Sequence, residues 1–486
     1  MSKKSYIWVN IVIYIYMALP ILIFVIGWLR WYWALGFSVL ISFACLRGFM
    51  DSAQNNYWII EGNYKTFLKA LLLIVVWVYL SGIGGWCYQN SDHEVRNAIF
   101  RALVEYDWPV VSVNGQRGLI YYIGFWLPAA CVGKVFGMEA GYATQFIWAV
   151  LGIFMVYYLI CTYRKKVDLW PMAFLILFSG LDYVGTWLLG LEGANLNLAA
   201  HLEWWAADFQ FTSMTSQLFW VFNQAIPAWL ATMMISVQKD CKNILFILSL
   251  CMLSSTIPFV GLIPIVIYFY IKRVIADKTT WNEVFTFQNV VGVLIVGGCA
   301  FLYLIGNISG GMVKQDNASL VIKEPMAGLL RYLLFYFLEF GVYLYFIYKC
   351  KKKKSLLYLV VAILLVCPFI KVGVGHDFCM RASVPALFIL MIMCMDTLEK
   401  IYLDNKRCML VAYGIVLIIG SITAFNEIHR SIRETFVRVT AGESVRYPEI
   451  DIESQVLQYG NFSGETENKI FYKYFANVYD TYDSLK

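Results

Sequence analysis

Charged residues are scarce in this chain. Of its 486 residues only 14% are Asp, Glu, Lys or Arg, whereas 60% are hydrophobic. A water-soluble protein of this size could not keep so many hydrophobic side chains off its surface, so the composition excludes a soluble globular fold. The chain is therefore predicted to be an all-α polytopic membrane protein. Its net charge of +6 does not indicate nucleic-acid binding, because the basic residues stand in short clusters between apolar segments, where they set orientation.

Motifs for several kinds of chemistry are also missing. The sequence has no CxxC pair and no His/Cys pattern with the spacing of a metal site. It has no GxxxxGK loop, no GxSxG elbow and no HExxH helix. These absences argue against a nucleotide-sugar site, a serine hydrolase and a zinc peptidase.

The apolar segments predict about 13 membrane-spanning helices, since each has roughly the length that a bilayer requires. They are residues 6–29, 31–50, 66–86, 141–161, 169–190, 217–238, 243–255, 258–272, 285–306, 328–348, 355–371, 383–398 and 409–425. Two of them, 243–255 and 258–272, are short. Pro258 and Pro264 interrupt this region, so we expect a hairpin of two half-spans there.

The segment 118–137 is apolar enough to span, but the basic residues favour a different placement. If it crossed the membrane, the cluster at 164–166 would lie opposite the one at 3–4, against the positive-inside bias. Pro128 and Lys134 fit a helix that lies in the outer interface instead. That assignment puts every basic cluster on the cytoplasmic side, namely 3–4, 164–166, 239–242, 272–273, 349–354 and 406–407.

The same assignment predicts an outer side that is rich in polar residues. Four loops and the C-terminal tail lie there: 87–117, 191–216, 307–327, 372–382 and 426–486. Asp92, His201 and Arg381 are therefore expected to be extracytoplasmic. Because the outer loops are longer and chemically richer than the inner ones, we expect the active surface on that side.

The order of features between residues 66 and 166 is the most informative part of the chain. An apolar run, 66–86, leads into a loop with Asp92, and a predicted interfacial helix, 127–137, ends in Gly-Lys-Val-Phe-Gly. A span, 141–161, and an Arg/Lys cluster, 164–166, follow. This order resembles the start of the GT-C superfamily of membrane glycosyltransferases, which includes protein mannosyltransferases.

The resemblance implies a division of the chain and a location. In the family the Asp-containing loop usually follows the first span, whereas here it follows the third. Residues 1–65 would thus form an additional N-terminal transmembrane hairpin, 66–425 the catalytic core, and 426–486 a polar tail. The family also implies an active site on the extracytoplasmic face, and we expect an integral multi-pass protein of a bacterial plasma membrane.

The chemistry implied by the resemblance is an inverting transfer of a sugar from a polyprenyl-phosphate donor to a glycan acceptor. An acceptor hydroxyl needs a carboxylate to take its proton, and Asp92 is the first candidate, with Glu94 in reserve. Arg96 lies four residues after Asp92, so on a helix the two share a face. A solvated ion pair between Asp92 and Arg96, with no catalytic role, is the alternative.

Cations are expected to hold the lipid phosphate that leaves. Arg96 and the loop 371–383, with Lys371, His376 and Arg381, supply them, and the guanidinium fork of arginine suits phosphate. The alternative for Lys371 and Arg381 is that they reach lipid headgroups as anchors.

A third group of polar and aromatic residues is predicted to bind the sugar or acceptor. Tryptophan faces stack on sugar rings, and amides and acids bind hydroxyls. The group comprises His201, Glu203, Trp204, Trp205, Asn223 and Gln224. Tryptophans also gather at every membrane interface, which is the alternative for Trp204 and Trp205.

Two other function classes stay open. A polysaccharide polymerase or ligase that acts on lipid-linked glycans would depend more on outer arginines than on one acid. A flippase or transporter would carry charges in the middle of several spans, where Glu339 is the main example here. A divalent cation held by Asp92, Glu94, His201 or Asp377 is chemically conceivable, although the spacing of these residues gives it no support.

Overall fold

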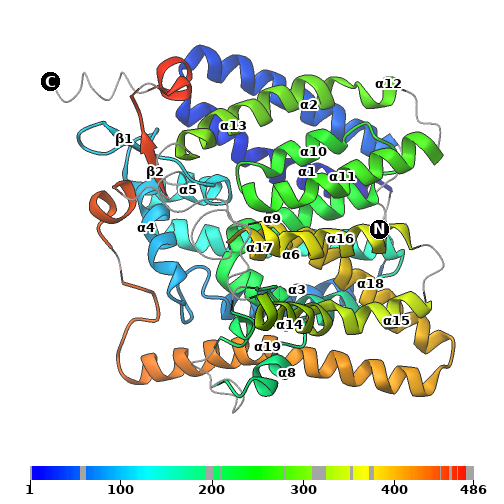
Figure 1. Cartoon of the computed structure of the whole chain (residues 1–486). Helices are drawn as coiled ribbons and strands as arrows, with labels where there is room; N and C mark the ends of the chain where they lie inside the picture. Colours follow the sequence, from blue (N-terminus) through cyan, green and yellow to red (C-terminus); the bar gives the residue numbers. More distant parts are fainter. Residues whose placement is uncertain are drawn as a thin grey trace.

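The computed structural model describes residues 3–54, 62–191, 201–207, 209–276, 281–308, 325–350, 354–370, 377–448, 450–458, 462–467 and 469–477. Almost all of the regular structure in these ranges is helical, and one small sheet of two short strands lies at one end (Figure 1). The helices run side by side, as expected for a chain whose apolar segments must satisfy their backbone hydrogen bonds within each segment.

The α-helices are α1 Lys3–Trp28, α2 Trp31–Gln54, α3 Tyr64–Leu80, α4 Asp92–Glu105, α5 Leu127–Phe136, α6 Met138–Arg164, α7 Trp170–Leu177, α8 Asp182–Leu188, α9 Met214–Val237, α10 Ile244–Cys251, α11 Thr256–Ala276, α12 Trp281–Val284, α13 Val293–Ile308, α14 Pro325–Tyr336, α15 Val342–Cys350, α16 Ser355–Val366, α17 Asp377–Ala382, α18 Val384–Leu403 and α19 Arg407–Thr440. Short 3-10 or π-helical turns are η1 Gly124–Trp126, η3 Leu202–Trp204, η4 Gln288–Gly292, η5 Phe337–Gly341, η6 Cys367–Phe369, η7 Glu453–Leu457 and η8 Phe471–Phe475. The strands are β1 Arg117–Leu119 and β2 Ser463–Glu465.

Nine helices in the described part of the chain are long and apolar enough to cross a membrane. They comprise α1, α2, α6, α9, α11 and α19, together with the helical stretches Trp170–Leu188, Gln288–Gly306 and Gly328–Cys350. This composition is that of a multi-pass membrane protein. The other four predicted segments are also helical, as α3, α10, α16 and α18, but they are shorter or, like α18, carry several charges. The predicted total of about 13 spans therefore stays a prediction.

The described basic clusters meet at one end of the bundle. Arg164 of α6 donates to Glu399 of α18 at 2.5 Å, and Lys400 donates to the Cys350 carbonyl at the end of α15. Arg273 of α11 donates to backbone carbonyls just beyond α9. We call this the basic end, defined by residues 164–168, 238–242, 272–273 and 399–407. Lys351 to Lys353 lie outside the described residues.

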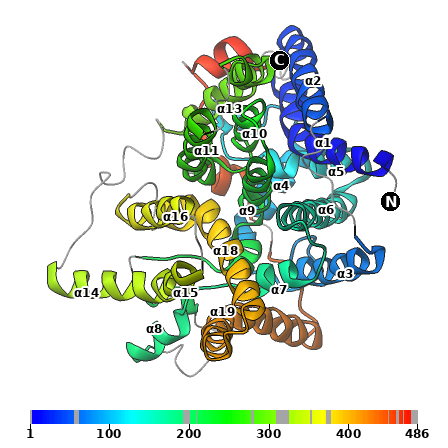
Figure 2. The same ribbon diagram turned by 90° about the vertical axis from the view of Figure 1, so that its right-hand side faces the viewer.

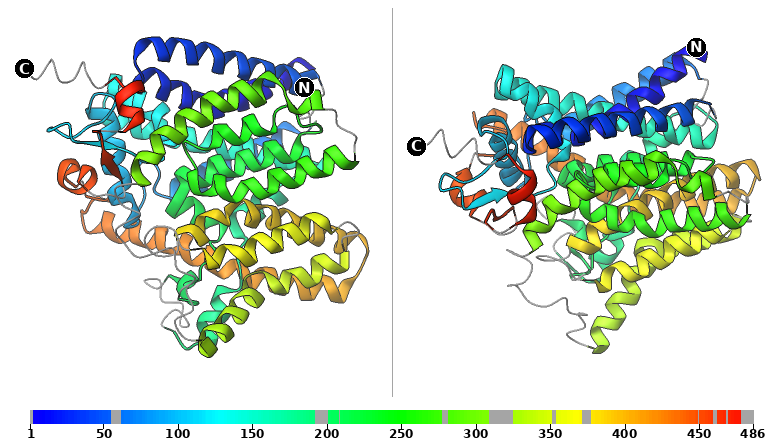
Figure 3. Two further views of the ribbon diagram at one scale, coloured as in Figure 1. Left: turned by 45° about the horizontal axis from the view of Figure 1, so that its top comes forward. Right: turned by 90° about the horizontal axis from the view of Figure 1, so that it is seen from above.

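The opposite end carries the polar loops. Residues 81–126, 201–207, 377–383, 441–448, 450–458, 462–467 and 469–477 lie toward this end, which also carries α4 and the two strands (Figures 1 and 3). Strand β2 pairs antiparallel with β1, and Arg117 donates to Ser463 Oγ at 2.9 Å. Residues 463–465 thus lie against residues 117–119, which are far away in sequence. We call this the loop end.

Helix α5 is too short to cross a bilayer. Its ten residues extend about 15 Å, half the thickness of a hydrocarbon core. Gly137, with a φ of 88°, turns the chain directly into α6. Gly133 and Gly141 let α5 and α6 approach closely, because a Cβ on Gly141 would lie 3.2 Å from the Gly133 Cα. An interfacial position for α5 stays a prediction.

Helix α9 is the central element. It packs against α6, α10, α11 and α18, and nearly all of its residues are buried (Figure 2). Val221 has a non-helical backbone, with φ −138° and ψ 34°, so α9 is kinked next to Phe222. A break in a buried membrane helix frees backbone groups to bond elsewhere, and such breaks commonly mark binding sites.

One glycine sets the position of the short helix α17, which carries Arg381. A Cβ on Gly261 of α11 would lie 1.8 Å from the Ala382 carbonyl oxygen. Gly261→Ala should therefore push α17 away and lower stability by about 1–3 kcal/mol. Gly298→Ala in α13 is the matched control, because no atom lies within 4 Å of the added Cβ. Thermal unfolding of both purified variants measures the difference, and equal unfolding temperatures would contradict this packing.

Candidate functional site

Residues 219–224 of the kinked helix α9 connect two groups of predicted site residues. On one side Asn90 Nδ2 donates to the Phe219 carbonyl at 2.9 Å, and the Arg96 guanidinium lies 5.7 Å from the Phe222 ring centre. On the other side the His201 ring stacks on Trp220, with 5.0 Å between ring centres. The loop-end constellations that are separate in sequence thus meet at one helix.

The first group begins where α4 begins. The Asn90 side chain accepts a hydrogen bond from the Asp92 backbone N–H at 3.1 Å, and the acids in the first turn suit the positive end of the helix dipole. Asp92 Oδ2 pairs with Arg96 Nη2 at 2.7 Å, one turn on. Arg96 is 7% exposed and Asp92 41%. The ion pair that the sequence left open is present, and its carboxylate is the accessible partner. Glu94, in the same turn, is half-buried.

Arg381 of α17 lies near the Asp92–Arg96 pair. Its Nη2 pairs with Asp377 Oδ1 at 3.1 Å, and its Nη1 donates to the hydroxyl of Tyr122. The Tyr122 ring lies against Tyr121, with 3.6 Å between ring centres. Burial lowers the pKa of Arg381. The opposing effect of the charges of Tyr122, Asp377, Tyr121 and Asp92 is larger, so the pKa lies above its usual value and the guanidinium stays charged. Arg381 therefore lies within electrostatic range of Asp92. We call Asp92, Arg96, Tyr121, Tyr122 and Arg381 the arginine cluster.

Buried donors of the arginine cluster have no partner in the described part of the chain. Arg96 Nη1 and Arg381 Nε are both inaccessible to solvent and unpaired there. A buried unpaired donor is costly, and a charged one more so, which makes each unpaired donor a pointer to a ligand. Both are guanidinium N–H groups, so the ligand that would satisfy them is an anion.

His93 adds an acceptor beside these donors. Burial, and then the charge of Arg96, lower the pKa of His93 to about 3, so the ring is neutral. Because Asn90 Nδ2 is committed to Phe219, its Oδ1 accepts, and His93 Nδ1 is the donor at 3.1 Å. His93 Nε2 is then an acceptor, buried and unpaired in the described ranges. It is suited to receive a hydroxyl proton in a hydrogen bond.

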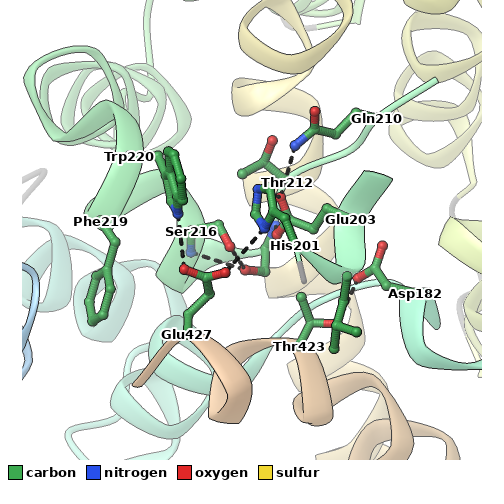
Figure 4. A network of polar contacts seen from close by, with 12 residues as sticks. Asp182, His201, Glu203, Gln210, Thr212, Ser216, Phe219, Trp220, Thr423 and Glu427 are labelled. Atoms are coloured by element: carbon green, nitrogen blue, oxygen red, sulfur yellow. Dashed lines mark hydrogen bonds and ion pairs between the residues drawn. The ribbon is translucent and has the colours of Figure 1, made fainter. Parts of the chain in front are cut away.

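The second group is a buried network around Glu427 of α19 (Figure 4). Glu427 accepts hydrogen bonds from Trp220 Nε1 at 2.9 Å and Arg430 Nη1 at 3.0 Å, and its Oε1 lies 3.1 Å from His201 Nδ1. The other ring nitrogen of His201 lies 3.7 Å from Glu203 Oε2. We call His201, Glu203, Glu427 and Arg430 the carboxylate network.

Glu203, which lies outside the spans, is an acid of this network whose pKa is raised. Its carboxylate accepts from the Ser213 N–H at 2.8 Å and from Gln210 Nε2 at 3.1 Å. Burial raises the pKa of Glu203 to about 7, with a further rise from the charge of Asp182, although His201 opposes it. Burial lowers the pKa of His201, but Glu427 and Glu203 raise it above its usual value. Two proton-binding groups with raised pKa values, Glu203 and His201, therefore lie side by side.

The two predicted tryptophans have different surroundings. Trp204 is 61% exposed and meets the edge of His201, with 5.0 Å between ring centres. Trp205 is 2% exposed and donates its Nε1–H to Glu339 at 3.0 Å. Of the two, Trp204 offers a ring face to a ligand at the loop end.

Asn223 and Gln224 lie just after the kink in α9, each 1% exposed. Neither amide atom of Asn223, nor Oε1 of Gln224, has a hydrogen-bond partner among the described residues. Buried amides in this state favour a polar ligand next to Phe222. Two other predicted site residues, Lys371 and His376, lie outside the described residues.

The described part of the chain holds no group of three or more His, Cys, Asp or Glu arranged to bind an ion. Comparison of the chain with protein-family models, with curated proteins and with solved structures finds no match.

Sequence reasoning missed several of these residues. Glu427 and Arg430 follow the last predicted span, in what was expected to be a polar tail, yet α19 continues through both to Thr440. Their spacing of three residues, directly after an apolar run, was the available signal. Tyr121 and Tyr122 were hidden in the apolar segment 118–137. His93 stood between two acids, and only the fold shows that it is buried.

The carboxylate network predicts a pH-dependent stability. A carboxyl whose folded-state pKa is raised holds a proton that the unfolded chain releases, so stability falls as pH rises from about 4.5 to about 7. His201, with its raised pKa, contributes in the same direction. Glu203→Gln mimics the protonated acid and should flatten this fall, a change on the order of 1–3 kcal/mol.

The measurement is thermal unfolding of the purified protein at pH 5, 6, 7 and 8. Glu443→Gln, at an exposed position of the loop end, serves as the control and should keep the wild-type slope. If the unfolding temperature of Glu203→Gln fell with pH as steeply as that of the wild type, this carboxyl would not be the titrating group.

Proposed function

We propose that the protein is a membrane glycosyltransferase of the GT-C type. It moves a sugar from a polyprenyl-phosphate donor to a cell-surface or lipid-linked glycan acceptor, with Asp92 as the general base. The observation that carries this proposal is the arginine cluster: an accessible carboxylate lies beside two buried arginines from distant parts of the chain, and each arginine has an unpaired N–H.

The arginines support the donor part of the proposal. As the glycosidic bond breaks, negative charge grows on the lipid phosphate, and preplaced guanidinium groups stabilise it. Arg96 Nη1 and Arg381 Nε are unpaired in the described structure, while the other contacts of each arginine fix its orientation. A phosphate that reaches these two buried N–H groups would gain charge-assisted hydrogen bonds from guanidinium groups whose orientation is already fixed.

Asp92 supports the acceptor part. In a single inverting displacement, the acceptor oxygen attacks the anomeric carbon, its proton passes to the carboxylate, and the lipid phosphate leaves with the bonding electrons. Asp92 is accessible enough to meet an acceptor, and Arg96 holds it at 2.7 Å. Glu94 is the reserve base. The unpaired atoms of His93, Asn223 and Gln224, with the exposed face of Trp204, are proposed to bind sugar hydroxyls and a ring face.

The arrangement of charges supports an extracytoplasmic site. The arginine cluster lies at the loop end, opposite the end that holds the described basic clusters. By the positive-inside bias the basic end faces the cytoplasm, so the loop end faces outward in a bacterial plasma membrane.

A polysaccharide polymerase or ligase is the second candidate. It is favoured by one observation: the loop end holds three largely buried arginines, Arg96, Arg381 and Arg430, whereas Asp92 is itself ion-paired. Such an enzyme would tolerate the loss of Asp92 better than the loss of an arginine.

The base is tested by Asp92→Asn. The amide keeps the size of the side chain and loses its basicity, so glycosyl transfer should fall on the order of 10²- to 10⁴-fold, with insertion and folding intact. Asp107→Asn, at an exposed position of the same end, is the control and should retain transfer. Turnover of both purified variants in lipid nanodiscs is the measurement. Near-normal transfer by Asp92→Asn would move the role to Glu94 or favour the polymerase.

The phosphate contact is tested by Arg381→Lys. Lysine keeps the charge but loses the two-pronged geometry, so binding of polyprenyl phosphate should weaken roughly 10- to 100-fold, nearly as much as in Arg381→Ala. A membrane anchor would tolerate lysine. Arg433→Lys, exposed on α19, is the control. Binding is compared at matched thermal stability. Wild-type affinity in Arg381→Lys would indicate that Arg381 is a membrane anchor and does not bind the phosphate.

A further inference from the structure

A second site for an anion lies at the basic end, away from the arginine cluster. A cavity of about 200 Å³ opens there between the ends of α6, α9, α11 and α16 and the middle of α18. Its volume is that of roughly six or seven liquid waters, enough for a phosphate group with its ester atoms. Its lining residues are Tyr163, Ser236, Phe269, Lys272, Arg273, Leu356, Ile389, Ile392 and Met393.

The polar part of the cavity is cationic. Arg273 is 6% exposed, lies over the Phe269 ring at 5.0 Å and donates to the carbonyls of Gln238 and Asp240. Its position is thus fixed. Lys272, beside it, is exposed and forms no ion pair within the described ranges. The hydroxyl group of Tyr163 adds a further donor suited to a phosphate, whereas the Ser236 hydroxyl already donates to the Thr232 carbonyl at 2.7 Å.

The rest of the lining is apolar and favours a lipid over a free anion. Ile389, Ile392 and Met393 of α18 form a continuous wall. On α11, Ile271 and Ile275 flank Lys272 and are 54% and 75% exposed, as expected for a helix face toward lipid. A ligand held here would meet cations with its headgroup and apolar side chains with its first chain carbons.

We propose that this cavity binds the phosphate headgroup of an anionic phospholipid of the leaflet at the basic end. The proposal is independent of glycosyl transfer. A single lysine near an anionic lipid surface typically contributes a few-fold in affinity, and the fixed Arg273 and the apolar wall would make this contribution specific to the cavity.

The test is binding of short-chain phosphatidylglycerol to the purified full-length chain, with phosphatidylcholine and inorganic phosphate as comparison ligands. Wild type should bind phosphatidylglycerol in preference to both. Lys272→Gln should weaken this binding about fivefold. Lys65→Gln should not, because Lys65 is an exposed lysine at the start of α3, at the same end but outside the cavity. Ser236→Met, which fills the cavity and leaves its charges, should also weaken binding.

Each outcome decides the proposal. Equal losses in Lys272→Gln and Lys65→Gln would reduce the effect to general attraction between cations and lipid, and would overturn it. Inorganic phosphate that binds as well as phosphatidylglycerol would make this a free-anion site instead. Equal binding of phosphatidylcholine would leave only apolar contact. Should Ser236→Met fail to fold, the comparison of the two lysine variants is sufficient.

Discussion

Pairing of buried arginines with acids on their own helices is the constraint on which the loop end depends. Arg96 pairs with Asp92 and Arg381 with Asp377, each four residues apart, and Arg430 pairs with Glu427, three apart. A buried charge without such a partner would be strongly destabilising. Because each pair is local, it forms wherever its helix forms. Tertiary packing then brings together helices whose buried arginines are already neutralised, and Arg96 Nη1 and Arg381 Nε stay unpaired among the described residues.

Helix α9 lies between these ion pairs and contacts residues of two of them. Its kink at Val221 lies between Trp220, which donates to Glu427, and Phe222, which meets Arg96 and His93. A change of protonation in the carboxylate network would therefore act on the same turn of helix that borders the arginine cluster. The pKa of Glu203 is raised to about 7 and that of His201 is also raised, whereas the raised pKa of Arg381 keeps its guanidinium charged, so we expect a pH response of the site to arise from the network.

The fold followed from the sequence to the extent that hydropathy determines it. Each predicted apolar segment contains a helix over much of its described length, because a backbone in lipid has few other options. The Asp92–Arg96 pair followed from helical spacing. Contacts between distant segments could not be foreseen: Arg381 meets Tyr122, Trp205 turns inward to Glu339, and β2 pairs with β1. Each depends on tertiary packing that no local pattern in a single sequence records. Glu427 was missed for a different reason: it lies beyond the last predicted span, and its three-residue spacing from Arg430 was not used.

The central proposal is that this membrane protein transfers a sugar from a polyprenyl-phosphate donor to a cell-surface or lipid-linked glycan. The most direct measurement is mass spectrometry of surface and lipid-linked glycans from cells with the gene, without it, and with it restored. The account predicts that one sugar addition disappears without the gene, that its unglycosylated acceptor accumulates, and that the restored gene reverses both. Identical glycans in all three strains would contradict it.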